Sequence, residues 1–200
     1  AGDTLTILGD DVNHMKNVLR MKPGEEICVS NGSDGKEYQC RIRSLEEDRV
    51  WCDLIAVTEE GSELPSRVFL FQGLPKGDKM ETVVQKAVEL GVSRIIPLMT
   101  ERTIVRLSGK DAAAKADKWR RTVLEACKQC GVNTLPVVEE PQSYKQFLQR
   151  QDVPALRVQC AIVPHARPLR AVLEARRADG HHDCILLIGP EGDFSPAEYA

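Results

Sequence analysis

The chain has 200 residues, of which 42% are apolar and 28% are charged, and its formal net charge is −3. These proportions are typical of a globular chain with one large domain or two small ones. No apolar run approaches the ~20 residues that a membrane-spanning helix needs. The first residues also lack the basic region and apolar stretch of a secretory signal. We therefore expect a cytoplasmic protein that does not span a membrane.

The seven cysteines are odd in number and lie mostly in apolar segments, which favours reduced, buried thiols over a disulfide framework. Cys127 and Cys130 form a C-x-x-C pair, but no second pair of Cys or His follows at a spacing suited to zinc. We interpret the pair as core packing and expect no metal site.

Residues 1–66 are predicted to form a small β-rich domain. Strands are expected at 4–8, 25–31, 37–42 and 49–57, with a hairpin turn at Asn31–Gly35 between the second and third. Residues 10–21 are expected to form a short helix that places Val12, Met15, Val18 and Leu19 on one face. Short strands joined by turns are typical of a small barrel. Residues 59–66 have the composition of a linker, so we place the domain boundary after Ser66.

Residues 67–200 alternate strands with helices. Strands are predicted at 68–72, 94–98, 135–138, 159–163 and 184–188, and helices at 78–90, 111–130, 143–150 and 168–178. We expect Asp78 with Glu81 to cap the first helix and Gly131 to end the second, whose inward positions include Trp119 and Cys130. Repeated βα units predict a parallel α/β sheet with helices on both faces and ligands at the carboxyl ends of its strands.

The segment Gly189-Pro190-Glu191-Gly192 follows the last predicted strand and exposes backbone N–H groups ahead of a helix start. Such a loop suits an anion or the adenosine part of a cofactor, although a purely structural turn is as consistent with the spacing. The chain contains neither a P-loop nor a G-x-G-x-x-G motif. His165 follows another predicted strand. Two interpretations of this residue stay open, a catalytic base and a hydrogen-bonded loop residue.

Charge is uneven along the chain. Residues 1–66 hold 7 Lys and Arg against 14 Asp and Glu, whereas residues 102–121 hold seven basic and two acidic residues. This basic stretch fits a phosphate-binding surface and, equally, a solvated helix face.

The last residues predict a helix start, with Ser195 as N-cap, Pro196 at the first position and Glu198 three residues after the cap. Because the sequence stops at Ala200, we expect the natural protein to continue beyond it.

Four segments together resemble one family. "GPEGDFSPAE", "KGDKMETVVQKAVELGVSRIIPLMTERT", "EACKQCG" and "HMKNVLRMKPGEEI" are similar to the motifs of SPOUT-superfamily methyltransferases that modify N3 of uridine in 16S ribosomal RNA. The resemblance runs through nearly the whole chain in the expected order.

The resemblance implies a PUA-like β-barrel over 1–66 and a SPOUT-type α/β methyltransferase domain with a trefoil knot over 67–200. It also implies S-adenosyl-L-methionine as cofactor, small-subunit ribosomal RNA as partner, and a homodimer. Transferred to matching positions, it places His165, Gly189, Pro190, Glu191 and Gly192 at the cofactor. Glu101 and Arg102 would be catalytic, and RNA would be contacted by Lys76, Lys79, Arg106 and Gln129. His14 and Arg20 would contact RNA as well or belong to the structure of the barrel. Glu89 and Thr100 would complete the cleft.

The chain departs from the family at Asp193, Val132 and Ala166, where relatives commonly carry Gly, Arg and Glu. It also lacks the family's Leu-Gly-x-x-Ile-Leu-Arg-x-Glu-Thr segment, which threads the knot and carries a catalytic Arg. We therefore expect these 200 residues to be a poor enzyme in isolation. Two alternatives remain open: a non-catalytic RNA-binding relative, and an α/β enzyme acting on a small molecule.

Overall fold

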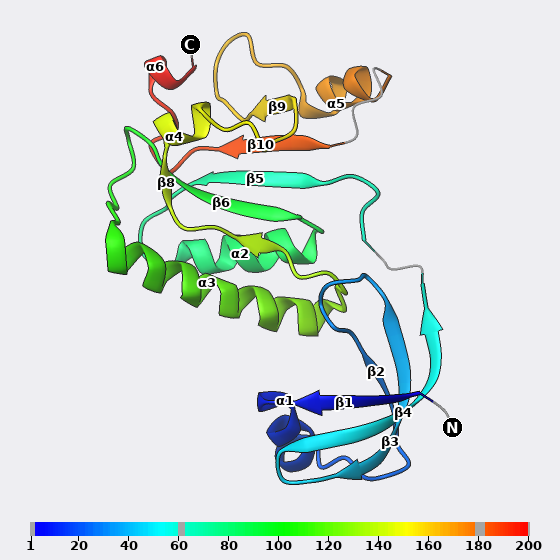
Figure 1. Ribbon diagram of the computed structural model, residues 1–200. Helices are drawn as coiled ribbons and strands as arrows, with labels where there is room; N and C mark the ends of the chain where they lie inside the picture. Colours follow the sequence, from blue (N-terminus) through cyan, green and yellow to red (C-terminus); the bar gives the residue numbers. More distant parts are fainter. Residues whose placement is uncertain (1–2, 60–62, 179–182, 200) are drawn as a thin grey trace. The chain divides into compact units, whose positions relative to one another are not determined.

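The computed structural model describes residues 3–59, 63–178 and 183–199 (Figure 1). The chain divides into two compact units, unit 1 from Ala1 to Glu63 and unit 2 from Leu64 to Ala200. This division falls three residues before the expected boundary at Ser66, and residues 60–62 of the predicted linker lie outside the described residues. In the described part of the chain, no helix combines the length and apolar character needed to cross a membrane.

Unit 1 contains a four-stranded antiparallel sheet in the order β1-β4-β3-β2. The strands are β1 (Thr4–Leu8), β2 (Glu26–Val29), β3 (Glu37–Leu45) and β4 (Arg49–Thr58). The predicted hairpin is confirmed: the Asn31 side chain accepts hydrogen bonds from the backbone of Ser33 and Asp34, which fixes the turn between β2 and β3. The described strands pair in a row, with β1 and β2 at its two edges, so they form an open sheet where a closed barrel was expected.

The predicted helix of unit 1 is only partly confirmed. Its first turn is α1 (Asp10–Asn13), but His14–Val18 (η1) is π-helical, with the Leu19 N–H donating to the His14 carbonyl at 2.9 Å. Val12 and Met15 are buried on the sheet, whereas Val18 and Leu19 are 62% and 51% exposed. A π-turn holds more residues than an α-turn, so it rotates Val18 and Leu19 away from the face that a 3.6-residue period predicts.

Unit 2 is built on the parallel sheet that the sequence predicts, in the order β7-β6-β5-β10-β9, with β8 also paired to β6. The strands are β5 (Val68–Gly73), β6 (Arg94–Met99), β7 (Val137–Val138), β8 (Gln142–Ser143), β9 (Leu156–Gln159) and β10 (Cys184–Ile188). The strand expected at 159–163 is instead β9, because pairing with β10 matches Leu156 to Cys184 and Gln159 to Leu187. Ile162, an apolar residue of the predicted strand, is 97% exposed.

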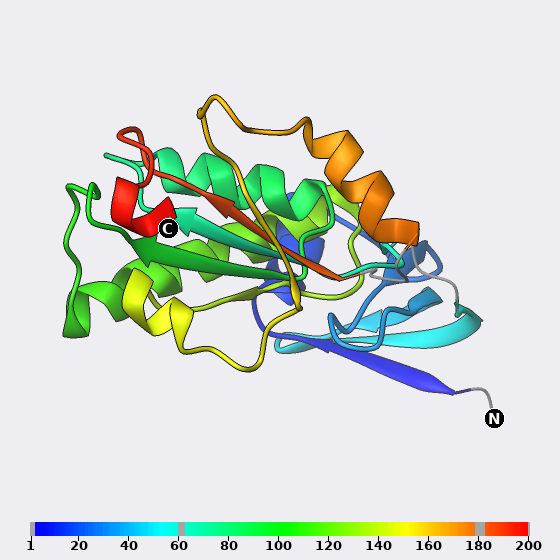
Figure 2. The ribbon, with the colours of Figure 1, turned by 90° about the horizontal axis from the view of Figure 1, so that it is seen from above.

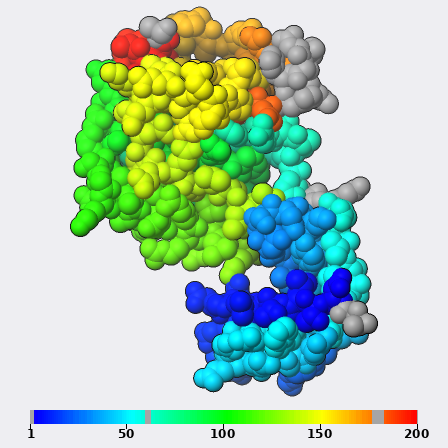
Figure 3. Space-filling view, in the orientation of Figure 1, coloured from blue at the N-terminus to red at the C-terminus, as the bar shows by residue number. Residues whose placement is uncertain are grey.

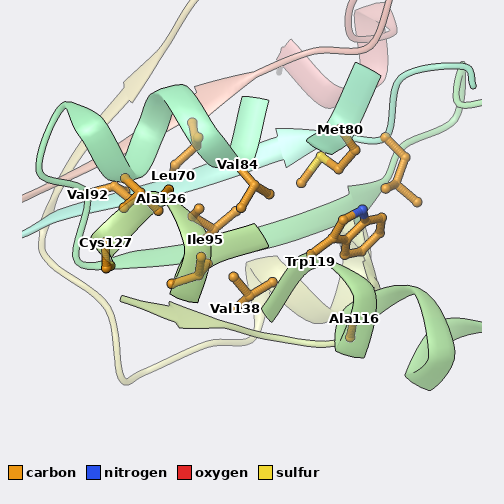
Figure 4. Close-up of a cluster of buried hydrophobic side chains, with 13 residues drawn as sticks. Leu70, Met80, Val84, Val92, Ile95, Ala116, Trp119, Ala126, Cys127 and Val138 are labelled. Carbon is orange, nitrogen blue, oxygen red and sulfur yellow. The ribbon is translucent and has the colours of Figure 1, made fainter. Parts of the chain in front are cut away.

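Helices cover both faces of this sheet, as predicted (Figures 1 and 2). α2 (Lys79–Glu89) and α3 (Gly109–Cys130) pack on one face. α4 (Tyr144–Leu148), α5 (Leu169–Ala178) and α6 (Pro196–Tyr199) lie on the other side. The hydrophobic cluster between the sheet and helices α2 and α3 includes Leu70, Val84, Ile95 and Trp119 (Figure 4). A second cluster, with Phe71, Phe147 and Phe194, fills the opposite face.

The helix ends differ in how well the sequence predicts them. Gly131 ends α3 in the left-handed conformation, with φ 72°, as expected. Asp78 precedes α2 but its side chain makes no capping hydrogen bond, so that part of the prediction is wrong. Cys130, in the last turn of α3, is exposed rather than inward and is not part of the cluster that contains Cys127.

Candidate active site

Three loops leave neighbouring parallel strands at the same edge of the unit 2 sheet. They are residues 74–78 after β5, 100–108 after β6 and 189–195 after β10. β5 pairs with both β6 and β10, so the carboxyl ends of all three strands lie together. This is the edge at which parallel α/β sheets bind ligands.

The loop 189–195 is packed so closely, both against the end of β5 and within itself, that two glycines are required. A Cβ on Gly73 would lie 2.5 Å from Pro190 N and 2.9 Å from the Gly189 carbonyl carbon. A Cβ on Gly189 would lie 2.9 Å from Asp193 Cα. The Gln72 side chain donates to the Gly73 carbonyl at 2.9 Å and to the Gly189 carbonyl at 3.4 Å. The backbone of the loop is therefore held against the end of β5.

Glu191 connects this loop to the one after β5. Its carboxylate accepts a hydrogen bond from the Lys76 N–H at 3.1 Å and from Lys79 Nζ at 2.8 Å. The hydrogen bond from Lys79, followed by the backbone bonds, lowers the pKa of Glu191 to about 2. The expected cofactor residue Glu191 and the expected RNA-contacting residue Lys79 thus form an ion pair with each other.

The arginines of the loop after β6 donate to backbone carbonyls. Arg102 Nη1 donates to the Gly192 carbonyl at 2.9 Å. Arg106 donates to the carbonyls of Thr100 at 2.9 Å and Glu101 at 3.0 Å. Part of the basic stretch at 102–121 is therefore engaged within the fold, and these two arginines order the loops that carry them.

Two further residues at this edge, Asp193 and Glu198, were not among the expected site residues. Asp193 adopts a left-handed backbone with φ 58°, and its Oδ1 accepts the Phe194 N–H at 2.9 Å. Glu198 accepts N–H bonds from Ser195 at 3.0 Å and from Glu101 at 2.8 Å. The sequence identified Glu198 only as the third helical residue after a serine cap. Ser195 Oγ itself is buried and makes no hydrogen bond within the described residues.

Several predicted site residues lie away from these loops. Helices α2 and α3 start at the site edge and run back across the sheet, so Glu89 is about 15 Å and Gln129 about 30 Å along its helix axis from the start. Glu89 pairs with Lys86. Gln129 lines a polar hollow of about 410 Å³ between α2 and α3.

Three further candidates, His165, His14 and Arg20, lie outside the three loops and are exposed. His165 lies in the connection between β9 and α5, and the described contacts do not join it to residues 189–192. His14 lies in the π-helical turn of unit 1, and Arg20 follows that turn with φ 55°. These three remain candidates by position in the sequence alone.

Thiols and metal ligands add nothing to the site. All seven cysteines are free, but Cys28, Cys130 and Cys160 are exposed, which the sequence did not predict. Within the described ranges, no three His, Cys, Asp or Glu residues gather as a metal site would require.

Comparison with known proteins identifies the family of both units. The family model described as "RNA methyltransferase domain" matches residues 62–200, and the one described as "RNA methyltransferase PUA domain" matches residues 7–55. A Bacillus subtilis protein named ribosomal RNA small subunit methyltransferase E is 36% identical over 98% of this chain and 77% of its own length.

Two solved structures also resemble the chain, each over 99% of it and 78% of their own length, at 32% identity. One is a proposed methyltransferase from Legionella pneumophila with the cofactor SAM bound, with a TM-score of 0.81. The other is a ribosomal RNA small subunit methyltransferase E from Neisseria gonorrhoeae bound to S-adenosyl methionine, with a TM-score of 0.79. The chain therefore belongs to the family of RNA methyltransferases that combine a PUA domain with an RNA methyltransferase domain.

Proposed function

We propose that this protein transfers the methyl group of S-adenosylmethionine to N3 of a uridine in 16S ribosomal RNA. The observation that carries the proposal is the Gly189–Gly192 loop, whose backbone is fixed at the carboxyl end of β10 in a chain of the RNA methyltransferase family. Relatives named as small-subunit ribosomal RNA methyltransferases, two of the similar structures with bound cofactor, and the motifs around this loop support it.

The residues present fit such a cofactor. Gly192 lacks a side chain at a position where a Cβ would touch Arg102 at 3.4 Å, so the loop backbone lies directly against the loop after β6. Ser195 Oγ is a buried hydroxyl without a described partner at the end of the same loop. Bound S-adenosylmethionine would supply an electrophilic methyl group on a sulfonium ion.

The proposed chemistry asks two things of the chain's own residues. Uridine N3 carries a proton at neutral pH, so the site must stabilise the anion that forms when this proton leaves. It must also aim N3 along the line of transfer. Arg102 uses one of its five N–H donors on Gly192, and we assign the remaining ones to the uridine anion. Glu101, on the same turn, is the candidate to accept the proton.

RNA binding completes the proposal. A base paired through N3 is inaccessible, so the target uridine must be unpaired or extruded. We propose that unit 1 holds the RNA through its PUA domain with His14 and Arg20, and that Lys76, Arg106 and Gln129 contribute from unit 2. The trefoil knot, the homodimer, and a cytoplasmic location beside the ribosome belong to the same proposal.

Titration calorimetry with S-adenosylmethionine, followed by methyl transfer to 16S ribosomal RNA, tests this function. The expected product is 3-methyluridine at a single position, identified by mass spectrometry of nuclease digests. RNA binding that is salt-dependent, with no cofactor binding, would instead support the non-catalytic alternative. Cofactor binding with methylation of a small molecule and not of RNA would support the second alternative.

The expectation that these 200 residues are a poor enzyme alone also stays a prediction. Its test compares the chain with a version extended by the family's Leu-Gly-x-x-Ile-Leu-Arg-x-Glu-Thr segment. Equal methylation rates for the two versions would contradict the expectation, and cofactor binding by neither would contradict the proposed function.

A further inference from the structure

Glu198 joins two loops that are far apart in the sequence. One carboxylate oxygen accepts the Ser195 N–H at 3.0 Å, and the other accepts the Glu101 N–H at 2.8 Å across 97 residues of sequence. The bond to Ser195 is the one that a capping glutamate makes at the start of its own helix. The bond to Glu101 has no part in capping, because Glu101 belongs to the turn after β6.

The position of Glu198 is itself fixed from the other side. Its carbonyl accepts hydrogen bonds from the Tyr144 hydroxyl at 2.7 Å and from Gln159 Nε2 at 3.3 Å. These partners come from α4 and from the end of β9, and Figure 3 shows α6 at the surface of unit 2 beside α4. One half-buried residue therefore links four segments of the unit.

A second bond ties the same pair of loops. Arg102, the neighbour of Glu101, donates to the Gly192 carbonyl at 2.9 Å. The turn at 100–103 is rigid in itself, since the Thr103 hydroxyl accepts the Thr100 N–H at 2.9 Å and both threonines are buried. A rigid turn held at two points has a defined position relative to its neighbour.

We propose that Glu198 is a positioning residue of the active site. It holds the 100–103 turn, with Glu101 and Arg102, in register with the loop 189–195 that is proposed to bind the cofactor. The inference rests on the proposed function. Glu198 is proposed to touch neither substrate nor cofactor and to act through the backbone of Glu101.

The test compares Glu198→Gln and Glu198→Ala with the control Glu174→Gln, which removes an equivalent charge from an exposed pair with Arg170 on α5. A glutamine offers one oxygen to two N–H donors, so Glu198→Gln loses one bond and Glu198→Ala loses both. Removing one hydrogen bond to a charged acceptor corresponds to a fall in rate of roughly tenfold or more. Measured in the version extended by the family's C-terminal segment, kcat is expected to fall about tenfold in the first variant and about 100-fold in the second.

Cofactor affinity separates positioning from a structural role. Gln72, Lys76 and Arg102 still hold residues 189–192 in these variants, so the dissociation constant for S-adenosylmethionine should stay within about threefold. Amide hydrogen exchange, followed by NMR, should accelerate at Glu101 and Ser195 in Glu198→Ala and stay unchanged in Glu174→Gln.

Three outcomes would overturn the inference alone, and the first two are full turnover by Glu198→Ala and unchanged exchange at the Glu101 amide. Parallel losses of kcat, cofactor affinity and thermal stability would also overturn it, because they indicate a structural role only. A wild-type protein that binds no S-adenosylmethionine and transfers no methyl group would overturn the proposed function instead.

Discussion

The contact between Gly73 and the loop at Pro190 leads to a sharp prediction for Gly73→Ala. Gly73 is buried at the end of β5, and a Cβ there would lie 2.5 Å from both Pro190 N and Pro190 Cδ. These atoms belong to a backbone and a closed ring, so neither can rotate away. The strand or the loop must therefore shift to admit a single methyl group.

The magnitude follows from two opposing effects. Forcing an extra methyl group into a packed site costs about 1–3 kcal/mol, and the short distances here place the cost at the upper end. Replacing glycine by alanine returns about 0.4–1 kcal/mol through the unfolded chain. The net loss of unfolding free energy is about 1–2 kcal/mol, or a fall in Tm of about 3–10 °C.

The assay must report on unit 2 alone, because a chain of two units need not unfold in one step. Trp119 is buried in unit 2 and Trp51 lies in unit 1, so a Trp51→Phe background lets the fluorescence of Trp119 follow unit 2. Gly192→Ala is the matched control, since its Cβ would meet nothing nearer than Arg102 at 3.4 Å. If Gly73→Ala were as stable as Gly192→Ala, the steric reasoning would be refuted.

Three further changes test the fold and the site. Phe194→Ala should cost about 3–5 kcal/mol in denaturant unfolding, because the ring is fully buried, while Ile162→Ala, at a 97% exposed position, should change stability by less than about 0.5 kcal/mol. Gly131→Ala should cost about 1 kcal/mol, since φ 72° strains an alanine; an unchanged Tm would contradict this. The lowered pKa of Glu191 means that its pairing with Lys79 contributes stability above about pH 4.5, and that this contribution is lost as pH falls toward 2. An NMR titration of the Glu191 carboxyl group with a midpoint near 4.5 would show that the pairing is absent in solution.

Much of the fold could be read from local sequence signals. The buried runs around Phe71 and Leu186 and the helical period around Val84 predict their elements because each strand or helix buries one face according to its own repeat. Gly131 and the turn at Asn31 were predictable because only a few residue types suit a left-handed cap or a tight turn. Family motifs likewise point to the loop at Gly189.

The errors arose where a neighbour outside the local window decides the outcome. β9 ends at Gln159 because its partner β10 sets the register, and apolar content alone cannot show this. The π-turn at His14 moves Val18 and Leu19 into solvent although their spacing fits a helix face. Cys130 has the correct period for the core but is exposed, because no neighbouring element among the described residues covers the last turn of α3 at this position.

The site shows the same division. The sequence and its family resemblance identified Glu101, Arg102 and Glu191 as separate candidates, each with its own expected role. The tertiary structure decides that Glu191 pairs with Lys79 and that Arg102 binds the Gly192 carbonyl. These contacts join residues about 100 positions apart, and they exist because the parallel order of β6, β5 and β10 brings three loops to one edge.

The sequence by itself determined the two-unit plan, the parallel α/β class of unit 2 and the strand followed by a glycine-rich loop at Gly189, since each depends on short-range pattern and composition. Only the tertiary structure decided which charged groups are paired, which glycines are required for close approach, and that Glu198 connects two loops. The physical reason is that hydrogen bonds and steric contacts depend on distances of a few ångströms between strands, and strand order is not written in any local stretch of the chain.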